Sequence, residues 1–295
     1  METGKSSVRS FHLAGIVPVA APPLEFNFPW HDSLMPIAND YLAVERAVVE
    51  CAVAGCETIW VVCHKNMQPL IRHRIGEKID DPVCIKKMMF EEERRRPIQI
   101  YYVPIHPKDQ VRRDCLGWSV LYGAYVAHAI SKKISKWVIP DRYYASFPYG
   151  ILDHKIVREH RHKISNKNRF FFSHNDRTVL DGDHLSFTFS GDDFIKVRRA
   201  FRTATRSCYF KSMEEGLPPD ERVHGKEFSL DKMFESVIMD DNDVVVELPW
   251  FYNIDTWEGF CEYAGSKYSR EVQRPDYLKY REWNPIGLDR EDEEQ

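Results

Sequence analysis

The apolar stretch Leu13-Ala14-Gly15-Ile16-Val17-Pro18-Val19 decides the fold, together with the two segments that come after it. Apolar residues recur with helical spacing over 42–54, and a second apolar stretch, Thr58-Ile59-Trp60-Val61-Val62-Cys63, comes soon afterwards. Short continuous apolar runs of this kind are typical of strands that are buried on both faces of a sheet. The order strand, helix, strand therefore predicts two parallel strands joined by a right-handed crossover helix.

The same alternation continues along the rest of the chain. Apolar runs and helical spacing predict further strands over 98–105, 136–140, 185–189 and 244–248, and helices over 85–96, 118–130, 192–201, 230–239 and 257–264. This alternation favours an α/β fold with a doubly wound, mainly parallel sheet and helices on both faces. Because no repeat or linker interrupts it, we expect one domain over 1–268, followed by a charged tail over 269–295.

Composition and charge exclude several classes of protein. The 295 residues are 43% hydrophobic, which is enough for a sizeable core, and the formal net charge is -4. A slightly acidic chain has no general attraction for nucleic acid or for an anionic membrane surface. No apolar run reaches the roughly 18 residues of a membrane span, and the N-terminus lacks the apolar core of a signal peptide. We therefore expect a soluble, cytoplasmic protein with no membrane partner and no nucleic-acid partner.

Two aspartates follow predicted strands and are candidate metal ligands. Asp141 ends the predicted strand over 136–140, and Asp255 lies between the predicted strand over 244–248 and the next helix. Ligands of open α/β sheets bind beyond the carboxyl ends of the strands, and Mg²⁺ prefers one or two carboxylates together with phosphate oxygens. The pair could therefore share one Mg²⁺ ion. A structural interpretation stays open beside it, in which Asp141 caps a turn and Asp255 or Thr256 caps a helix.

Several short motifs occur in the order that a known family shows. They are Ala14-Gly15, Leu34-Met35-Pro36-Ile37, Ala54-Gly55-Cys56-Glu57-Thr58-Ile59, Leu116-Gly117-Trp118 and Val138-Ile139-Pro140-Asp141. From about 13 to 264 the chain resembles the sugar-phosphate nucleotidyltransferases, or NDP-sugar pyrophosphorylases. Members of this family make a nucleotide sugar and pyrophosphate from a nucleoside triphosphate and a sugar 1-phosphate.

The resemblance implies roles for individual residues. It implies a GT-A-type architecture, with Ala14 and Gly15 at the start of the triphosphate-binding loop and Gly117 near the nucleobase. It also implies Asp141 and Asp255 as catalytic ligands of Mg²⁺, although a register shift of two would put Asn253 in the second position.

The chain departs from the family where the triphosphate binds. The family's loop reads Gly-x-Gly-Thr-Arg, whereas Gly15 is followed here by Ile16-Val17-Pro18-Val19, and Pro18 has no N–H to donate. The position at which the family has a lysine, further along this loop, falls near His31-Asp32. The chain therefore has a carboxylate where the family has a cation. The candidate substitutes for binding phosphate are Lys65 and Arg142, each predicted to lie just beyond a strand, and His31 in the loop itself.

Three functions are consistent with this pattern. The first is a divergent, Mg²⁺-dependent nucleotidyltransferase that acts on a nucleoside triphosphate and a sugar 1-phosphate. The second is a glycosyltransferase that binds a nucleotide sugar through the same two aspartates. The third is a non-catalytic protein that serves as a binding or structural module for a protein partner. The aspartate pair favours the first two, and the altered loop favours the third. In the first two, the ligand is a nucleotide or a nucleotide sugar.

Overall fold

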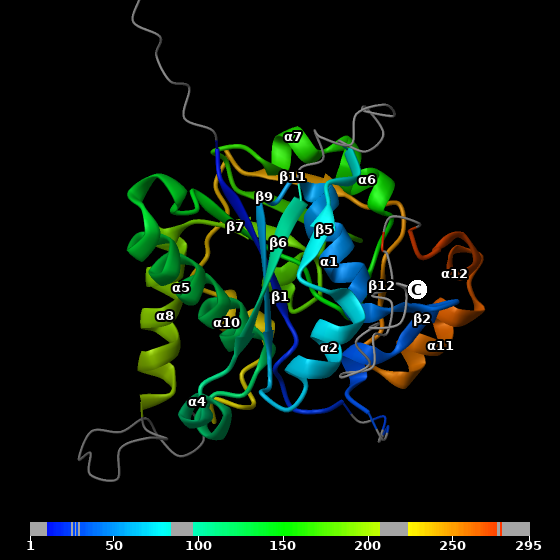
Figure 1. Ribbon diagram of the computed structural model, residues 1–295, viewed down its shortest axis with the longest axis horizontal. Helices are drawn as coiled ribbons and strands as arrows, with labels where there is room; N and C mark the ends of the chain where they lie inside the picture. Colours follow the sequence, from blue (N-terminus) through cyan, green and yellow to red (C-terminus); the bar gives the residue numbers. More distant parts are fainter. Residues whose placement is uncertain are drawn as a thin grey trace, which may run out of the picture.

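The computed structural model describes residues 11–24, 26, 28, 30–83, 97–206, 224–275 and 278. An eight-stranded sheet in the order β11-β9-β10-β7-β1-β4-β6-β5 forms its centre (Figure 1). Its strands are β1 (Leu13–Pro18), β4 (Thr58–Cys63), β5 (Lys78–Asp80), β6 (Pro97–Pro104), β7 (Arg142–Ala145), β9 (Phe170–Ser173), β10 (Phe187–Phe189) and β11 (Val244–Glu247). The four central strands β7, β1, β4 and β6 run parallel, whereas β10 and β5 run antiparallel to their neighbours. The predicted mainly parallel, doubly wound sheet is confirmed.

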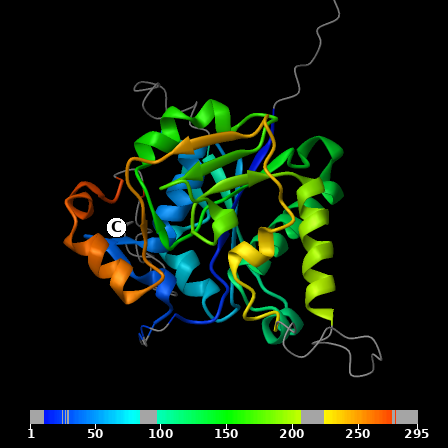
Figure 2. The same cartoon turned by 180° about the vertical axis from the view of Figure 1, so that it is seen from behind.

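Helices cover both faces of this sheet. One face packs on α1 (Ala43–Ala54), α2 (Gln68–Ile75), α6 (His154–Glu159) and α7 (Arg161–Ile164), and the other packs on α5 (Leu116–Ile134), α8 (Gly191–Ala204) and α10 (Leu230–Phe234). At opposite flanks of the molecule lie α8 and the pair α11 (Trp257–Gly265) and α12 (Tyr268–Glu271) (Figures 1 and 2). In the part of the chain that the structure describes, no helix combines the length and apolarity that crossing a membrane requires.

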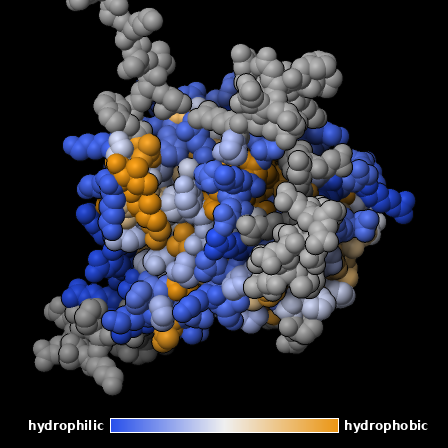
Figure 3. Space-filling view, in the orientation of Figure 1, coloured by the Kyte–Doolittle hydropathy of each residue, from blue (hydrophilic) through white to orange (hydrophobic). Residues whose placement is uncertain are grey.

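Short elements complete the chain and connect these layers. They are α4 (Pro107–Arg112), two small sheets formed by β2 (Pro36–Ala38) with β3 (Tyr41–Leu42) and by β8 (Gly150–Ile151) with β12 (Tyr252–Asn253), and the 3₁₀ turns η1 (Asp32–Leu34), η3 (Lys136–Val138) and η4 (Val179–Asp181). Hydrophilic residues cover most of the described surface drawn in Figure 3, and an apolar strip lies over α5, where Ile130 and Ile134 are exposed.

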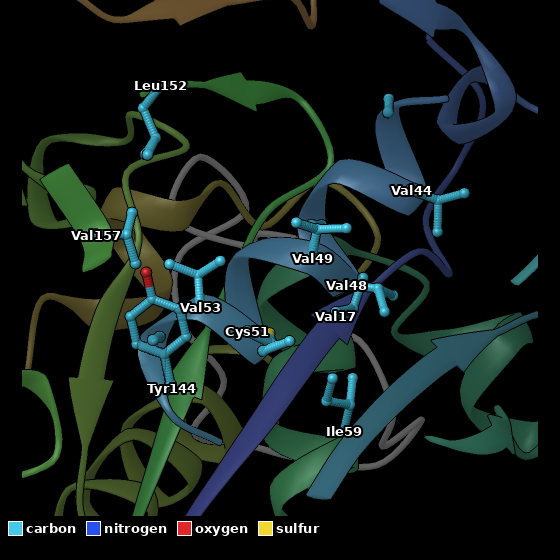
Figure 4. Packing of buried hydrophobic residues seen from close by; sticks show 14 of the residues in the cluster. Val17, Val44, Val48, Val49, Cys51, Val53, Ile59, Tyr144, Leu152 and Val157 are labelled. Carbon is cyan, nitrogen blue, oxygen red and sulfur yellow. The ribbon is translucent and has the colours of Figure 1, made fainter. Parts of the chain in front are cut away.

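Packing of α1 against β1 depends on small and β-branched residues. Val48 of α1 lies beside Val17 of β1 and near Ile59 of β4, whereas Val53 lies toward Tyr144 of β7 and Val157 of α6 (Figure 4). A Cβ atom on Gly15 would lie 2.8 Å from Cys51 Sγ, so glycine at this position allows the helix to approach the strand closely. The helix ends at Gly55, whose φ of 96° is the left-handed conformation of a C-terminal cap.

One predicted strand is wrong, and its error moves a candidate site residue. Residues 136–138 form the 3₁₀ turn η3 after α5, and the strand β7 begins only at Arg142. Pro140 lacks an N–H for a ladder hydrogen bond, which disfavours a strand over these residues. The N–H of Asp141 donates to the carbonyl of His12, directly before β1. Asp141 therefore stands before its strand, not after it.

Two further predictions concern the ends of the described segments. The predicted helix over 85–96 lies entirely outside the described residues, which end at 83 and resume at 97. The predicted boundary between 268 and 269 falls inside α12, and Arg274 Nη2 lies 3.5 Å from Glu45 Oε1 on α1. The first residues of the predicted tail thus pack on the domain, and the division into domain and tail stays a prediction.

An ion pair is buried between α1 and the sheet. Arg46 and Glu50 are 1% and 0% exposed, and their side chains meet at 2.6 Å. Glu50 also accepts hydrogen bonds from the hydroxyls of Tyr144 on β7 and Ser186 before β10, and Arg46 Nη2 donates to the carbonyl of Phe147. The pair therefore ties α1 to both β7 and β10.

A histidine beside this pair gives the fold a pH dependence. Burial, and then the charge of Arg46, lower the pKa of His154 from its ordinary value of 6.5 to about 4. The unfolded chain therefore takes up a proton at a higher pH than the folded chain, and stability falls as the pH drops from about 6.5 to about 4. We expect this residue alone to contribute a loss of about 3 kcal/mol over that window.

Urea denaturation between pH 7 and pH 4 measures this contribution. Burial also lowers the pKa of His31 and of His184, so the wild-type protein should lose more stability than His154 alone explains. His154→Phe should remove only its own share of the slope. An unchanged slope in that variant would contradict a neutral, buried His154.

Candidate functional site

The parallel strands deliver several loops to one edge of the sheet. We call this the carboxyl edge: residues 18–20, 63–65, 104–106 and 145–147 leave β1, β4, β6 and β7 there. In open α/β sheets, ligands bind outside this edge. The carboxyl edge is therefore where the candidate site residues have to be found.

The loop after β1 does not present free amides at this edge. The N–H groups of Val19 and Ala20 both donate to the carbonyl of Val62, at 2.8 and 2.9 Å, and both side chains are fully buried. Ala14 and Gly15 lie inside β1 and are buried, so they do not begin a phosphate-binding loop. Because β1 continues to Pro18 before the chain turns, this placement gives their predicted substrate-binding role no support, and the role stays a prediction.

Asp141 and Arg142 lie at the opposite, amino edge. Asp141 Oδ2 accepts the N–H of His12 at 2.9 Å, and Arg142 donates to the carbonyl of Lys167. Burial lowers the pKa of the Arg142 guanidinium, with Asp193 and Asp243 nearby to offset it. Asp141 directly precedes β7 and Arg142 is its first residue, so neither reaches a ligand at the carboxyl edge.

Asp255, in contrast, lies at the carboxyl edge. It follows β12, and the N–H of the preceding Ile254 donates to the carbonyl of Tyr149, four residues beyond the end of β7. The structure therefore does not bring Asp141 and Asp255 together, and a Mg²⁺ ion shared by these two carboxylates does not fit it. Among the described residues, no group of three or more His, Cys, Asp or Glu side chains could hold a metal ion.

This placement predicts that Asp141 serves stability and not ligand binding. Asp141→Ala removes the acceptor for the His12 N–H and should lower the free energy of unfolding by about 1–2 kcal/mol. Nucleotide or nucleotide-sugar affinity should not change. Urea denaturation and a ligand titration on the same preparation measure the two quantities, and a tenfold loss of affinity in a folded Asp141→Ala protein would contradict the assignment.

A set of polar side chains does meet at the carboxyl edge. His64, directly after β4, places Nε2 at 2.8 Å from Oδ1 of Asp114, in the turn before α5. The ring of His31 lies 6.2 Å from that of His64, and its Nδ1 is 2.9 Å from the hydroxyl of Ser33. Burial, and then the nearby His64, lower the pKa of His31, so this ring is neutral near pH 7.

A second set of polar side chains lies around Tyr149, which is itself buried, as is His184. His184 Nδ1 lies 2.8 Å from Asn253 Oδ1 and 3.7 Å from Asp255 Oδ2, and its ring is 5.7 Å from the ring of Tyr149. Burial raises the pKa of Tyr149, and the charges of Asp32 and Asp255 raise it further. Asp32 also acts on His31, so it connects the two sets. We call the whole group the edge cluster: His31, Asp32, His64, Asp114, Tyr149, His184, Asn253 and Asp255.

The remaining predicted residues have different outcomes. Lys65 is exposed two residues beyond the end of β4, at the carboxyl edge, as predicted. Gly117 lies in the first turn of α5, where a Cβ atom would stand 2.6 Å from Met233 Cγ, so packing against α10 explains this glycine without a nucleobase. Thr256 is the N-cap of α11, as one of the open interpretations had it, and its side chain accepts from the N–H of Gly259.

Of the three histidines in the edge cluster, the sequence named His31 as a candidate for binding phosphate and missed His64 and His184. His64 had a visible signal, because it directly follows a strongly apolar strand. His184 had none, since it lies in an irregular segment whose position depends on the tertiary fold.

We compared the sequence and the fold with those of known proteins. No protein-family model matches the sequence, and no curated protein matches it. A Bacillus anthracis protein assigned as a glucose-1-phosphate thymidylyltransferase, in complex with a sucrose, aligns with 90% of this chain and 98% of its own, at 9% identity and a TM-score of 0.57. A UDP-glucose pyrophosphorylase complexed with UDP-glucose aligns with 88% of this chain and 99% of its own, at 11% identity and a TM-score of 0.52.

The fold is that of the sugar-phosphate nucleotidyltransferases. Coverage of nearly the whole length of both relatives means that the likeness is not limited to the central sheet. The resemblance predicted from the order of short motifs is thus confirmed for the fold. At such low identities it does not extend to the activity.

Proposed function

We propose that this protein binds a nucleotide sugar at the carboxyl edge and does not synthesise one from a nucleoside triphosphate. The fold supports the ligand class, because the two solved relatives are named for glucose 1-phosphate and UDP-glucose chemistry. The edge cluster offers groups that suit a sugar and a phosphate ester, since the neutral His31 and His184, Tyr149 and Asn253 can all donate hydrogen bonds to oxygen.

The loop after β1 supports the second part of the proposal, that the protein does not use a nucleoside triphosphate as substrate. A triphosphate site needs several free amides or cations at one place. Here the amides of Val19 and Ala20 are already bonded to the carbonyl of Val62, and Pro18 has none. Opening this loop would break two buried hydrogen bonds without a gain from an arginine or a second glycine.

Charge at the carboxyl edge supports the same conclusion. Asp32, Asp114 and Asp255 belong to the edge cluster, whereas Lys65 is the exposed cation two residues beyond a parallel strand there. A nucleoside triphosphate carries more negative charge than a nucleotide sugar and is repelled more strongly by these carboxylates. Dependence on Mg²⁺ stays a prediction, which is tested by running the pyrophosphate assay and the calorimetric titration with and without Mg²⁺.

We expect no pyrophosphate release above the background rate. Loss of a single preorganised donor in a transition state typically costs about a hundredfold to a thousandfold in kcat, and this loop lacks several. The measurement is a coupled pyrophosphate assay with each common nucleoside triphosphate and glucose 1-phosphate, with and without Mg²⁺. Brisk release that disappears in the Val19→Asp variant would contradict the proposal.

Binding is measured separately by calorimetry with UDP-glucose and dTDP-glucose. Asp255→Asn and His184→Gln change the edge cluster and should each shift the dissociation constant at least about fivefold. The matched control is Glu262→Gln on the exposed face of α11. Binding that appears only with Mg²⁺, without pyrophosphate release, would favour a glycosyltransferase, and absence of any nucleotide-sugar binding would favour a structural module for a protein partner.

One observation favours nucleotidyl transfer as a second candidate. The His64–Asp114 pair is partly exposed, at 12% and 11% for the two side chains, and can hold or move a proton at Nε2 or Nδ1. An enzyme that used this pair would release pyrophosphate and lose that activity in His64→Gln, while keeping its fold.

A further inference from the structure

A row of aromatic rings borders the edge cluster. The rings lie between 5.4 and 6.2 Å from one another, and we call them the aromatic row: Trp30, Phe28, Phe26 and Trp257, in this order. The segment between β1 and η1, which carries the first three, lies beside α11, which carries Trp257, in both views of the ribbon (Figures 1 and 2). Trp30 directly precedes His31, and Trp257 follows Asp255 by two residues, so both ends of the row adjoin the edge cluster.

The two tryptophans at the ends of the row are open to solvent. Trp30 is 49% exposed and Trp257 is 58% exposed, whereas the two phenylalanines between them are partly buried. Single exposed apolar side chains are normal on a protein surface. Exposed indole rings that belong to one row of touching rings, next to polar side chains, are instead typical of a surface that binds a ligand.

Trp30 holds its exposed ring in a fixed position. The planes of Trp30 and Phe28 differ by only 14°, so Phe28 stacks against one face of the indole, and the exposed area belongs to the rest of the ring. Asp32 closes the segment by accepting the N–H of Leu24 at 2.7 Å, and its side chain is buried. A flat surface that is already ordered loses little entropy when a flat ligand stacks on it.

The chemistry of a nucleotide sugar decides which of its rings suits this surface. Gly117, which the family resemblance put near the nucleobase, packs against Met233, so the base is left without an assigned surface. A base is flat and aromatic, as the exposed indole is, and aromatic side chains are the usual platform for stacking bases. A sugar is puckered and carries several hydroxyls, which suit the hydrogen-bond donors of the edge cluster better.

We propose that the nucleobase of the bound nucleotide sugar stacks on Trp30, and that Trp257 supports the row through Phe26. This inference rests on the proposed function, because it places one part of the same ligand. Since Trp30 directly precedes His31, the rest of the nucleotide then lies beside the edge cluster. Every base has an aromatic face, so stacking distinguishes a nucleotide from a plain sugar phosphate but does not select one base.

Calorimetry with UMP, ribose 5-phosphate and UDP-glucose tests the stacking. Trp30→Ala should weaken the binding of UMP and UDP-glucose about fivefold to a hundredfold, which is the range typical of a base stacked on an aromatic side chain. It should leave ribose 5-phosphate, which has no base, unchanged. Trp30→Phe keeps an aromatic ring and should recover most of the affinity.

A change in the ligand tests the same contact without any variant. The base of 5,6-dihydro-UMP keeps the hydrogen-bonding groups of uracil but is no longer aromatic or flat. The wild-type protein should therefore bind 5,6-dihydro-UMP about as weakly as Trp30→Ala binds UMP. Equal affinity of the wild-type protein for UMP and 5,6-dihydro-UMP would contradict stacking.

Matched variants separate this contact from a general loss of an exposed ring. Tyr125, on α5 and outside the aromatic row, is 50% exposed, and Tyr125→Ala should leave the binding of UMP unchanged. Trp257→Ala should weaken UMP less than Trp30→Ala does, because it acts only through Phe26. Urea denaturation shows that each variant is folded.

The outcomes distinguish this proposal from the proposed function. Unchanged UDP-glucose affinity in a folded Trp30→Ala protein, or a larger loss in Trp257→Ala than in Trp30→Ala, would overturn the stacking and leave the proposed function in place. Binding of UMP that depends on Trp30, without any binding of UDP-glucose, would support the stacking and contradict the proposed function. Absence of binding of both ligands would contradict both.

Discussion

Glu50→Gln is expected to lower the free energy of unfolding by about 3–5 kcal/mol, which is a large share of the stability of a typical domain. The substitution keeps the shape of the side chain but leaves the guanidinium of Arg46 buried without its counter-charge. It also weakens the hydrogen bonds that Tyr144 and Ser186 donate to the carboxylate, and these bonds join α1 to β7 and β10. Urea denaturation at pH 7 measures the loss.

Two control variants show whether the loss comes from the unpaired charge of Arg46. Glu262→Gln makes the same chemical change on an exposed helix surface and should alter stability by no more than about 0.5 kcal/mol. The double variant Arg46→Met, Glu50→Leu removes both charges and should recover much of the loss, because the cost of an unpaired buried charge disappears. A Glu50→Gln protein as stable as Glu262→Gln would mean that water or an ion reaches Arg46.

The sheet was predictable because burial on both faces leaves a strong pattern. The strands β1 and β4 are continuous apolar runs, and α1 ends at a glycine whose left-handed conformation the sequence suggests. The strand predicted over 136–140 failed for a physical reason, since α5 continues to Ile134 and leaves too little chain for a strand before Pro140. From the sequence alone, a short apolar run after a helix cannot be told apart from a turn that precedes the next strand.

The site was less predictable than the fold, because one strand boundary decides which edge an aspartate reaches. Displacing β7 toward the C-terminus moved Asp141 from the carboxyl edge to the amino edge and put Ser146 at the end of the strand. Glycines misled in a similar way, since Gly15 and Gly117 serve close packing with Cys51 and Met233 and not ligand binding. The sequence shows that a small residue is needed, but not which neighbour requires it.

Gly150→Ala is expected to disturb both stability and the edge cluster. A Cβ atom on Gly150 would lie 2.0 Å from the carbonyl oxygen of His184, which is backbone and cannot rotate away. Either β8 or the segment that carries His184 has to move, and overpacking of this kind typically costs about 1–3 kcal/mol or more. Because Gly150 pairs with Asn253 across β8 and β12, the movement should also separate His184 from its partner Asn253.

A matched glycine separates this steric effect from a general effect of alanine. Gly265, the last residue of α11, has no atom within 4 Å of a built Cβ and no positive φ, so Gly265→Ala should leave stability unchanged or raise it by up to about 1 kcal/mol. Urea denaturation compares the two variants, and calorimetry with UDP-glucose shows whether Gly150→Ala also weakens binding. If Gly150→Ala lowered stability but kept full affinity, His184 would not belong to the ligand site. If Gly150→Ala were as stable as Gly265→Ala, the backbones of Gly150 and His184 would have to lie farther apart in solution than in this structure.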